Sequence, residues 1–204
     1  MILDPAELTP GAIYRFMIGA IVPRPIAFVS SIGPGGRLNL APFSYFIPIT
    51  NRPPLLGISI NLRAGLPKDT LRNIRDVGEF VVNVVNETLA QRMVQTSGDW
   101  PEEVSEFEIT GLTAIASELV KAPRVAESPI QLECRLHREI DFGDTTFVVG
   151  EIVRAHVADE ILTDGRIDPE KLHPVGRLGG DGYSVVRDVL HMPRPKVGPG
   201  APAG

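Results

Sequence analysis

The chain has 204 residues, 43% of them hydrophobic and 22% charged, and its formal net charge is −5 at pH 7. This length and composition are typical of one globular domain with a substantial core, which excludes a wholly disordered chain. The acidic balance, without a dense Lys/Arg run, argues against nucleic acid or an anionic membrane as the main partner, and no apolar run approaches the roughly 20 residues that span a bilayer.

The N-terminal third is predicted to be mostly β-structure. Residues 1–11 are acidic and interrupted by prolines, so they do not resemble a secretory signal. β-branched and aromatic residues at 25–32 predict a strand, a GPGG turn follows at 33–36, and 37–49 carries the chain back to complete a hairpin. A mostly buried strand is predicted at 55–62. Prolines within these segments indicate sheet edges or bulges, because proline cannot donate to a β-ladder.

Two helices are predicted to interrupt the strands. At 68–78, apolar residues three positions apart fall on one helical face, and Gly78 fits the C-terminal stop. A strand is predicted at 79–85 and a second helix at 87–97. A further short strand is expected near 107–110.

The clearest pair of long strands lies at 128–142 and 145–157, joined by a Gly-Asp turn. Cys134 alternates with apolar residues in the first of them and is predicted to lie in the core. As the single cysteine it cannot form an internal disulfide, and the spacing of metal ligands is not met, so no metal site is predicted. A reducing cytoplasm is the expected location.

Six or more strands with two interspersed helices, and no regular βαβ alternation, predict a mainly β protein: an antiparallel barrel with helical insertions. We expect one domain over residues 1–192. Residues 193–204 are rich in Pro, Gly and Ala and predict a flexible C-terminal tail.

Three segments, in this order and at these spacings, resemble the flavin reductase-like family: PRPIAFVSSIGPGGRLNLAPFSYF at 23–46, KDTLRNI at 68–74 and GEFVVN at 78–83. The similarity covers roughly residues 15–190. The resemblance implies an antiparallel split β-barrel that binds FMN, ahead of FAD, and that forms a homodimer with its sites at the subunit interface.

The resemblance also implies that the segment from Asn39 to Phe46 runs beside the isoalloxazine ring, with backbone groups meeting the polar edge of the ring. A flat ring needs small residues for close approach of the backbone, here Ala41 and Ser44, and a stiff chain, which Pro42 supplies. Phe43 shapes this wall or the core behind it. Taken alone, the segment also fits a bent edge strand with core aromatic residues.

A dianionic phosphate needs charge-assisted donors, preferably at a helix N-terminus. By similarity, Lys68 and Thr70 contact the phosphate, with Ser30 or Ser31 contributing from the adjoining strand. Arg63 either helps to bind the phosphate or faces water. The alternative is an ordinary helix cap beside a solvated lysine.

Two further residues are candidates for the flavin site. Arg24 lies between two prolines and is predicted either to act as a clamp near the flavin or the dimer contact, or to be a surface arginine on a rigid edge. Tyr183 belongs to the glycine-rich segment 168–184, in which it could stack on or cap the cofactor. That segment is expected to reach the cofactor or a partner subunit, with a flexible surface connection as the alternative.

The expected activity is that of an FMN-binding oxidoreductase, either an NAD(P)H-dependent flavin reductase or a flavin-holding reductase of a small organic substrate. Hydride transfer through a flavin needs no protein nucleophile, so no catalytic residue is assigned. A loosely held flavin would be passed to a partner monooxygenase. Some related reductases place a histidine in the hairpin that corresponds to 141–151, where this chain has none. That departure favours the alternative, a non-catalytic module for FMN or another planar ligand such as haem or deazaflavin.

Overall fold

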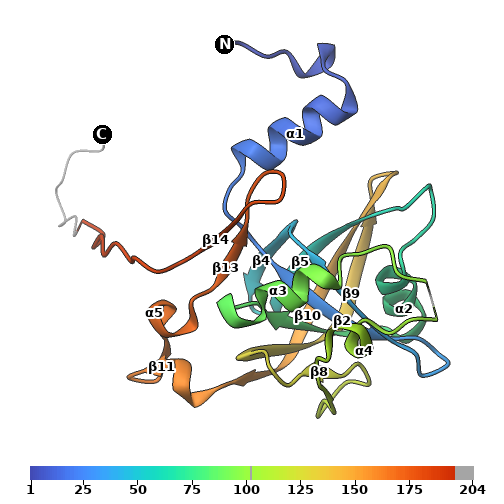
Figure 1. Cartoon of the computed structure of the whole chain (residues 1–204), viewed down its shortest axis with the longest axis vertical. Helices are drawn as coiled ribbons and strands as arrows, with labels where there is room; N and C mark the ends of the chain where they lie inside the picture. Colours follow the sequence, from blue (N-terminus) through green and yellow to red (C-terminus); the bar gives the residue numbers. More distant parts are fainter. Residues whose placement is uncertain (102, 196–204) are drawn as a thin grey trace.

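The structure is a computed structural model that describes residues 1–101 and 103–195 (Figure 1). Most of the predicted flexible tail therefore lies outside the described residues. No helix in the described ranges has the length and apolar character needed to cross a membrane.

A seven-stranded antiparallel sheet forms the body of the protein, as the mainly β prediction required. Its strands, in the order in which they pair, are β3 (Leu38–Phe43), β2 (Ala27–Ile32), β6 (Glu79–Val84), β9 (Ile130–Asp141), β10 (Thr145–Val157), β5 (Pro54–Asn61) and β4 (Phe46–Asn51). The two edge strands, β3 and β4, are consecutive in the sequence and are separated only by Ser44 and Tyr45. A link of this length spans at most about 11 Å, so the sheet has to roll up until its edges approach. The result is a barrel that is split between β3 and β4.

The prediction of one continuous return strand at 37–49 is therefore wrong in one respect. The chain leaves the sheet at Ser44 and re-enters at Phe46 on the opposite edge. Pro42 and Pro48 sit on these edges, as the proline rule requires, because neither residue has an N–H to donate.

The remaining elements surround the barrel. The helices are α1 (Pro10–Ala20), α2 (Asp69–Val77), α3 (Glu87–Gln95), α4 (Glu106–Thr110) and α5 (Pro169–Leu172), with short 3₁₀ turns η1 (Pro5–Glu7) and η2 (Asp159–Ile161). The short strands are β1 (Arg24–Pro25), β7 (Ala114–Ile115), β8 (Arg124–Val125), β11 (Leu162–Thr163), β12 (Arg166–Ile167), β13 (Val175–Arg177) and β14 (Tyr183–Val185). Strands β1, β13 and β14 form a small sheet of their own.

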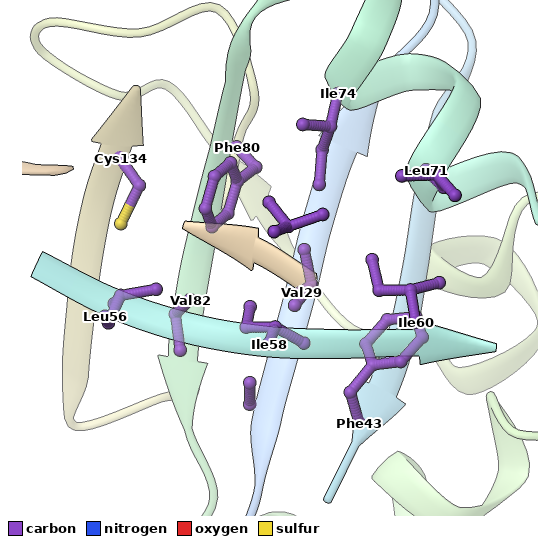
Figure 2. Close-up of a cluster of buried hydrophobic side chains, with 12 residues drawn as sticks. Val29, Phe43, Leu56, Ile58, Ile60, Leu71, Ile74, Phe80, Val82 and Cys134 are labelled. Carbon is purple, nitrogen blue, oxygen red and sulfur yellow. The ribbon is translucent and has the colours of Figure 1, made fainter. Parts of the chain in front are cut away.

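The main core fills the barrel, and Figure 2 shows it as a cluster of apolar side chains from the facing strands and from α2. Phe80 and Ile58 are fully buried there, and Leu71 and Ile74 close the barrel with the buried face of α2. Cys134 belongs to the same cluster, as predicted, and burial, followed by the nearby Glu133, raises the pKa of its thiol.

A second core lies on the outer face of the sheet, where α3 and α4 pack. Phe28 and Leu40 point into it together with Leu89 and Met93 of α3. Strand β2 is therefore buried on both faces, which explains why its sequence reads as a continuous apolar run rather than as an alternation.

Three elements differ from the sequence-based expectations. Residues 107–110 form part of helix α4, not a strand, and Gly111 ends it in the left-handed conformation. Helix α1 was not predicted; Thr9 caps its start, and none of its residues is buried, so it projects from the body (Figure 1). The segment 168–184 is not an irregular loop, because it contains α5, β13 and the start of β14.

Candidate functional site

Two adjoining cavities follow edge strand β3. One cavity of about 130 Å³ lies at its Lys68 end, where Ala41 and Phe43 also line it. A second cavity of about 380 Å³ lies at its Tyr183 end. Because Pro42 and Ser97 line both cavities, the two adjoin each other along residues 39–44, and together they are called the groove.

The Lys68 end combines a helix start with two cations. Lys68 is the N-cap residue of α2 but makes no side-chain capping hydrogen bond, so the first N–H groups of the helix have no side-chain acceptor from it. Its ammonium lies 5.8 Å from the centroid of the Phe43 ring. Burial, followed by the positive charge of Arg63, lowers the pKa of Lys68. An anion bound here would offset both effects.

The acidic residues around this end are already engaged. Asp69 pairs with Arg72, and Asp99 pairs with Arg63. Glu106 accepts a hydrogen bond from the Leu40 N–H at 3.0 Å, and burial raises the pKa of its carboxyl. No carboxylate within the described ranges pairs with Lys68, so its charge is available to a ligand.

The hydroxyl groups predicted to contact a phosphate lie behind the groove. Thr70 and Ser31 are buried, and both accept hydrogen bonds from the Asn39 amide, at 2.8 Å and 3.4 Å. Ser30 is buried on the other face of β2, where it donates to the Pro123 carbonyl. Through Asn39, the Ser31 and Thr70 hydroxyl groups tie β2, β3 and α2 together. None of the three hydroxyl groups lies in the wall of either cavity.

The wall of the groove is the segment predicted to face a flat ring. Ala41, Pro42 and Ser44 line it with small or rigid side chains. The Leu40 N–H points away from β2 to Glu106, and Pro42 shares this orientation because strand residues alternate. The carbonyl groups of Leu40 and Pro42 therefore face the open edge of the sheet, where a ligand with N–H donors can reach them. Pro42 costs the sheet no hydrogen bond at this position.

The Tyr183 end is formed by segments far apart in the sequence. Tyr183 and Arg177 come from the β13–β14 hairpin, Tyr14 from α1, and Ser44 from the end of the β3 wall. The guanidinium carbon of Arg177 lies 4.4 Å from the centroid of the Tyr183 ring.

Arg24 holds these segments together but lines neither cavity of the groove. It is only 6% exposed, and its guanidinium donates to the carbonyl oxygens of Ile18 at 2.8 Å, Ile21 at 3.1 Å and Leu178 at 3.0 Å. Its Nε donates to the Ser44 hydroxyl at 3.4 Å. The alternative of a surface arginine is therefore wrong, because Arg24 is buried and binds carbonyl oxygens of its own chain. A role of Arg24 near the flavin or at a dimer contact stays a prediction.

Sequence reasoning missed several residues of the groove. Trp100 lines the Lys68 end, where its indole N–H donates to the Gln95 carbonyl at 3.0 Å. Arg177 and Ser97 were also not predicted. One signal in the sequence could have pointed to the Tyr183 end: Arg177 lies six positions before Tyr183 in the same glycine-rich hairpin.

The 141–151 hairpin does not contribute to the groove. The Thr145 hydroxyl near its tip donates to the Asn61 side chain at 3.1 Å, and the Asp144 carbonyl accepts from the Leu62 N–H at 2.8 Å. The tip therefore lies against the end of β5.

A separate apolar hollow of about 280 Å³ adjoins the split. Met17 and Ile21 line it from the α1 side, and Tyr45 and Ile47 from β4 and the link before it. Ile21 is 55% exposed and Ile47 is 52% exposed. Most of the side chains that line this hollow are apolar, and the hollow meets the groove at Ser44.

Known proteins share this architecture and much of this sequence. An uncharacterised protein of Halalkalibacterium halodurans, BH2278, is 42% identical over 97% of this chain and 98% of its own. The crystal structure of nitrilotriacetate monooxygenase component B from Bacillus cereus is 37% identical, covers 94% of this chain and 98% of its own, and superposes with a TM-score of 0.90. Pseudomonas fluorescens 2-nitrobenzoate 2-nitroreductase is 35% identical, covers 98% and 100%, and gives a TM-score of 0.89.

The family profile described as flavin reductase like domain matches residues 18–170, which include both edges of the split, the helix start at Lys68 and the two long strands. The groove wall and its cationic end lie within the matched range, whereas Tyr183 and Arg177 lie beyond it. The chain belongs to the flavin reductase-like family.

Proposed function

We propose that the protein is an FMN-binding oxidoreductase whose flavin lies along the β3 groove. The observation that carries this proposal is the coincidence of an uncapped, cationic helix start at Lys68 with a small-residue wall at Ala41 and Pro42 in one groove. The donor set fits FMN, because the ligand's anionic and planar parts each find the chemistry they require.

Each part of the groove would then have a defined task. Lys68 and the first N–H groups of α2 bind the phosphate, and Arg63, which pairs with Asp99, lies at the mouth. The carbonyl groups on the open edge of β3 accept hydrogen bonds from the rim of the ring, and Pro42 keeps that edge rigid. FMN, when bound, supplies a centre that accepts and donates hydride. The protein holds the ring and leaves the Tyr183 end for a second ligand.

Two oxidoreductase activities are compatible with this site. The chain could reduce flavin with NAD(P)H and pass it to a partner monooxygenase, which agrees with the name of the B. cereus relative as a monooxygenase component. It could instead keep the flavin and reduce a small organic substrate, as the name of the P. fluorescens relative indicates for that protein. The cytoplasmic location stays a prediction.

We further propose that the protein is a homodimer in which a second copy covers the apolar hollow. The exposed Ile21 and Ile47, with the unpaired edge of β4, form a surface that a monomer would leave in water. Light scattering at several concentrations tests this. Ile47→Lys should convert the dimer to a monomer, and a wild-type protein that is monomeric at all concentrations would contradict the proposal.

Titration with FMN and assay of NADH and NADPH oxidation test the proposed activity. Saturable FMN binding with turnover supports the oxidoreductase. FMN binding without turnover, under a range of electron acceptors, would favour the non-catalytic module, an alternative that the absence of a histidine in the 141–151 hairpin keeps open. A protein that ignores FMN, haem and deazaflavin alike would contradict both.

A further inference from the structure

The Tyr183 end of the groove carries an arginine that forms no ion pair with a carboxylate among the described residues. Arg177 lies at the end of β13 and lines the groove together with Tyr183 and Ser44. Its contacts are with the Gly180 carbonyl and the Tyr183 ring, and no carboxylate within the described parts of the chain pairs with it. A guanidinium has several N–H donors in a planar fork, so some of them remain free for a ligand.

The structure holds this guanidinium in a fixed position. The Tyr183 ring supports one face of it, at 4.4 Å. The hairpin that carries it pairs with β1, and Arg24 binds the carbonyl of Leu178 in the turn. Gly176 allows the hairpin to approach Pro23, because a Cβ at this position would lie 2.7 Å from the Pro23 side chain. Little further ordering is needed for Arg177 to bind a ligand, which favours affinity.

The charge at this end is not needed for the phosphate of FMN. In the proposed orientation the phosphate lies at Lys68, at the opposite end of the groove. The isoalloxazine ring carries no phosphate, and the open carbonyl edge of β3 already meets its N–H donors. Asp181 also lines the Tyr183 end and forms no ion pair with Arg177, so an anion there would be attracted by Arg177 and repelled by Asp181.

We propose that Arg177 binds a carboxylate or phosphate group of the second ligand, the molecule that exchanges electrons with the flavin. This inference rests on the proposed function, because it needs a flavin along the β3 wall. The planar fork of arginine matches both anions in a bidentate manner, and stacking on Tyr183 leaves the edge of the fork free. The group can come from a small aromatic acid or from the diphosphate of a nicotinamide dinucleotide.

The test uses the full-length protein loaded with FMN and the variant Arg177→Gln. Benzoate and its neutral counterpart benzamide probe the carboxylate source through changes in the visible spectrum of the flavin. NADH and dihydronicotinamide riboside, which lacks phosphate, probe the second source through rapid reduction kinetics. We expect the dissociation constant of one anionic probe to rise at least about tenfold, while its neutral counterpart changes by less than about twofold.

Three further variants sharpen the result. Arg166→Gln removes an exposed arginine of β12, outside the groove, and should leave every constant unchanged. Arg177→Lys keeps the charge but not the fork, so it should fall between wild type and Arg177→Gln. Asp181→Asn removes the repulsive charge and should tighten the same anionic probe about two- to threefold at low salt.

If Arg177→Gln selectively weakens the binding of either anionic probe, the result supports the proposal and identifies the source of the anion. The proposal would be overturned if the dissociation constants of anionic and neutral probes changed equally, or if none of them changed. A tenfold loss of FMN affinity in Arg177→Gln would also overturn it, because Arg177 would then serve the flavin. These outcomes leave the proposed function intact, whereas a wild-type protein that binds no FMN would remove both.

Discussion

Replacement of Lys68 gives the sharpest test of the groove, because this side chain should matter to one part of the cofactor only. A charge-assisted hydrogen bond contributes roughly 1.5–3 kcal/mol. Lys68→Met should therefore weaken the binding of FMN by about 10- to 150-fold and that of riboflavin, which lacks the phosphate, by less than about twofold. Fluorescence titration of the flavin measures both constants. Lys121→Met, at an exposed lysine whose backbone N–H alone binds Glu79, is the matched control.

The same variant separates a ligand-binding lysine from a structural one. Burial and Arg63 lower the pKa of Lys68, so its charged form is less stable in the folded ligand-free protein than in the unfolded chain. Lys68→Met should leave the melting temperature of the ligand-free protein unchanged or raise it. The increase in melting temperature that FMN causes should become smaller in this variant. Equal losses of FMN and riboflavin affinity, or a marked fall in the ligand-free melting temperature, would refute the assignment.

Further predictions address the wall, the mouth of the groove, the pH response and a buried carboxylate. Ala41→Leu should weaken FMN and riboflavin alike, by tenfold or more in equilibrium titrations, because the added side chain occupies the wall; unchanged affinities would place the ring elsewhere. Trp100 is the only tryptophan of the chain, so its emission should be quenched saturably by FMN, and Lys68→Met should shift that titration; quenching unaffected by the variant would argue against a common site. FMN affinity should fall as the pH rises through the lowered pKa of Lys68, at a pH below 10.5, and titrations from pH 7 to 10 that show no decline would contradict this. Burial raises the pKa of the Glu133 carboxyl, but hydrogen bonds from the N–H groups of Glu118 and Leu119 and from His156 outweigh burial and lower this pKa overall. The ionised carboxylate therefore stabilises the fold above the pKa of the unfolded chain, and this stability is lost as the pH falls through the lower pKa of the folded protein. Glu133→Gln should lower the melting temperature at pH 7 by about 5 °C or more, with a smaller difference in acid.

The local sequence was sufficient for most of the elements. Apolar spacing placed α2 and α3 close to their observed bounds, and the long strands β9 and β10 were found with their turn. Helix α1 was missed because apolar residues lie on most sides of it, so its sequence shows no amphipathic period. Segment 107–110 was mistaken for a strand because a helix of one turn is too short to show a period.

The candidate site was predicted in part. Lys68, Ala41, Pro42 and Ser44 line the observed groove, and they were chosen because they share short motifs. The hydroxyl groups were harder to place, since a serine or threonine in a two-sided strand or at a helix start can point either way. Thr70 lies two positions from Lys68, yet Thr70 and Ser31 are both buried and accept hydrogen bonds from Asn39.

The sequence by itself determined that this is a mainly β protein with a rigid, small-residue segment and a lysine at the start of a helix, because these features depend on residues close together in the chain. Only the tertiary structure decided that the return strand breaks at Ser44, that its halves lie on opposite edges of the sheet, and that Arg177 and Tyr183 meet that break. The physical reason is that pairing across the sheet, and the buried Arg24 that binds Leu178 and Ser44, join segments which no local pattern of residues connects.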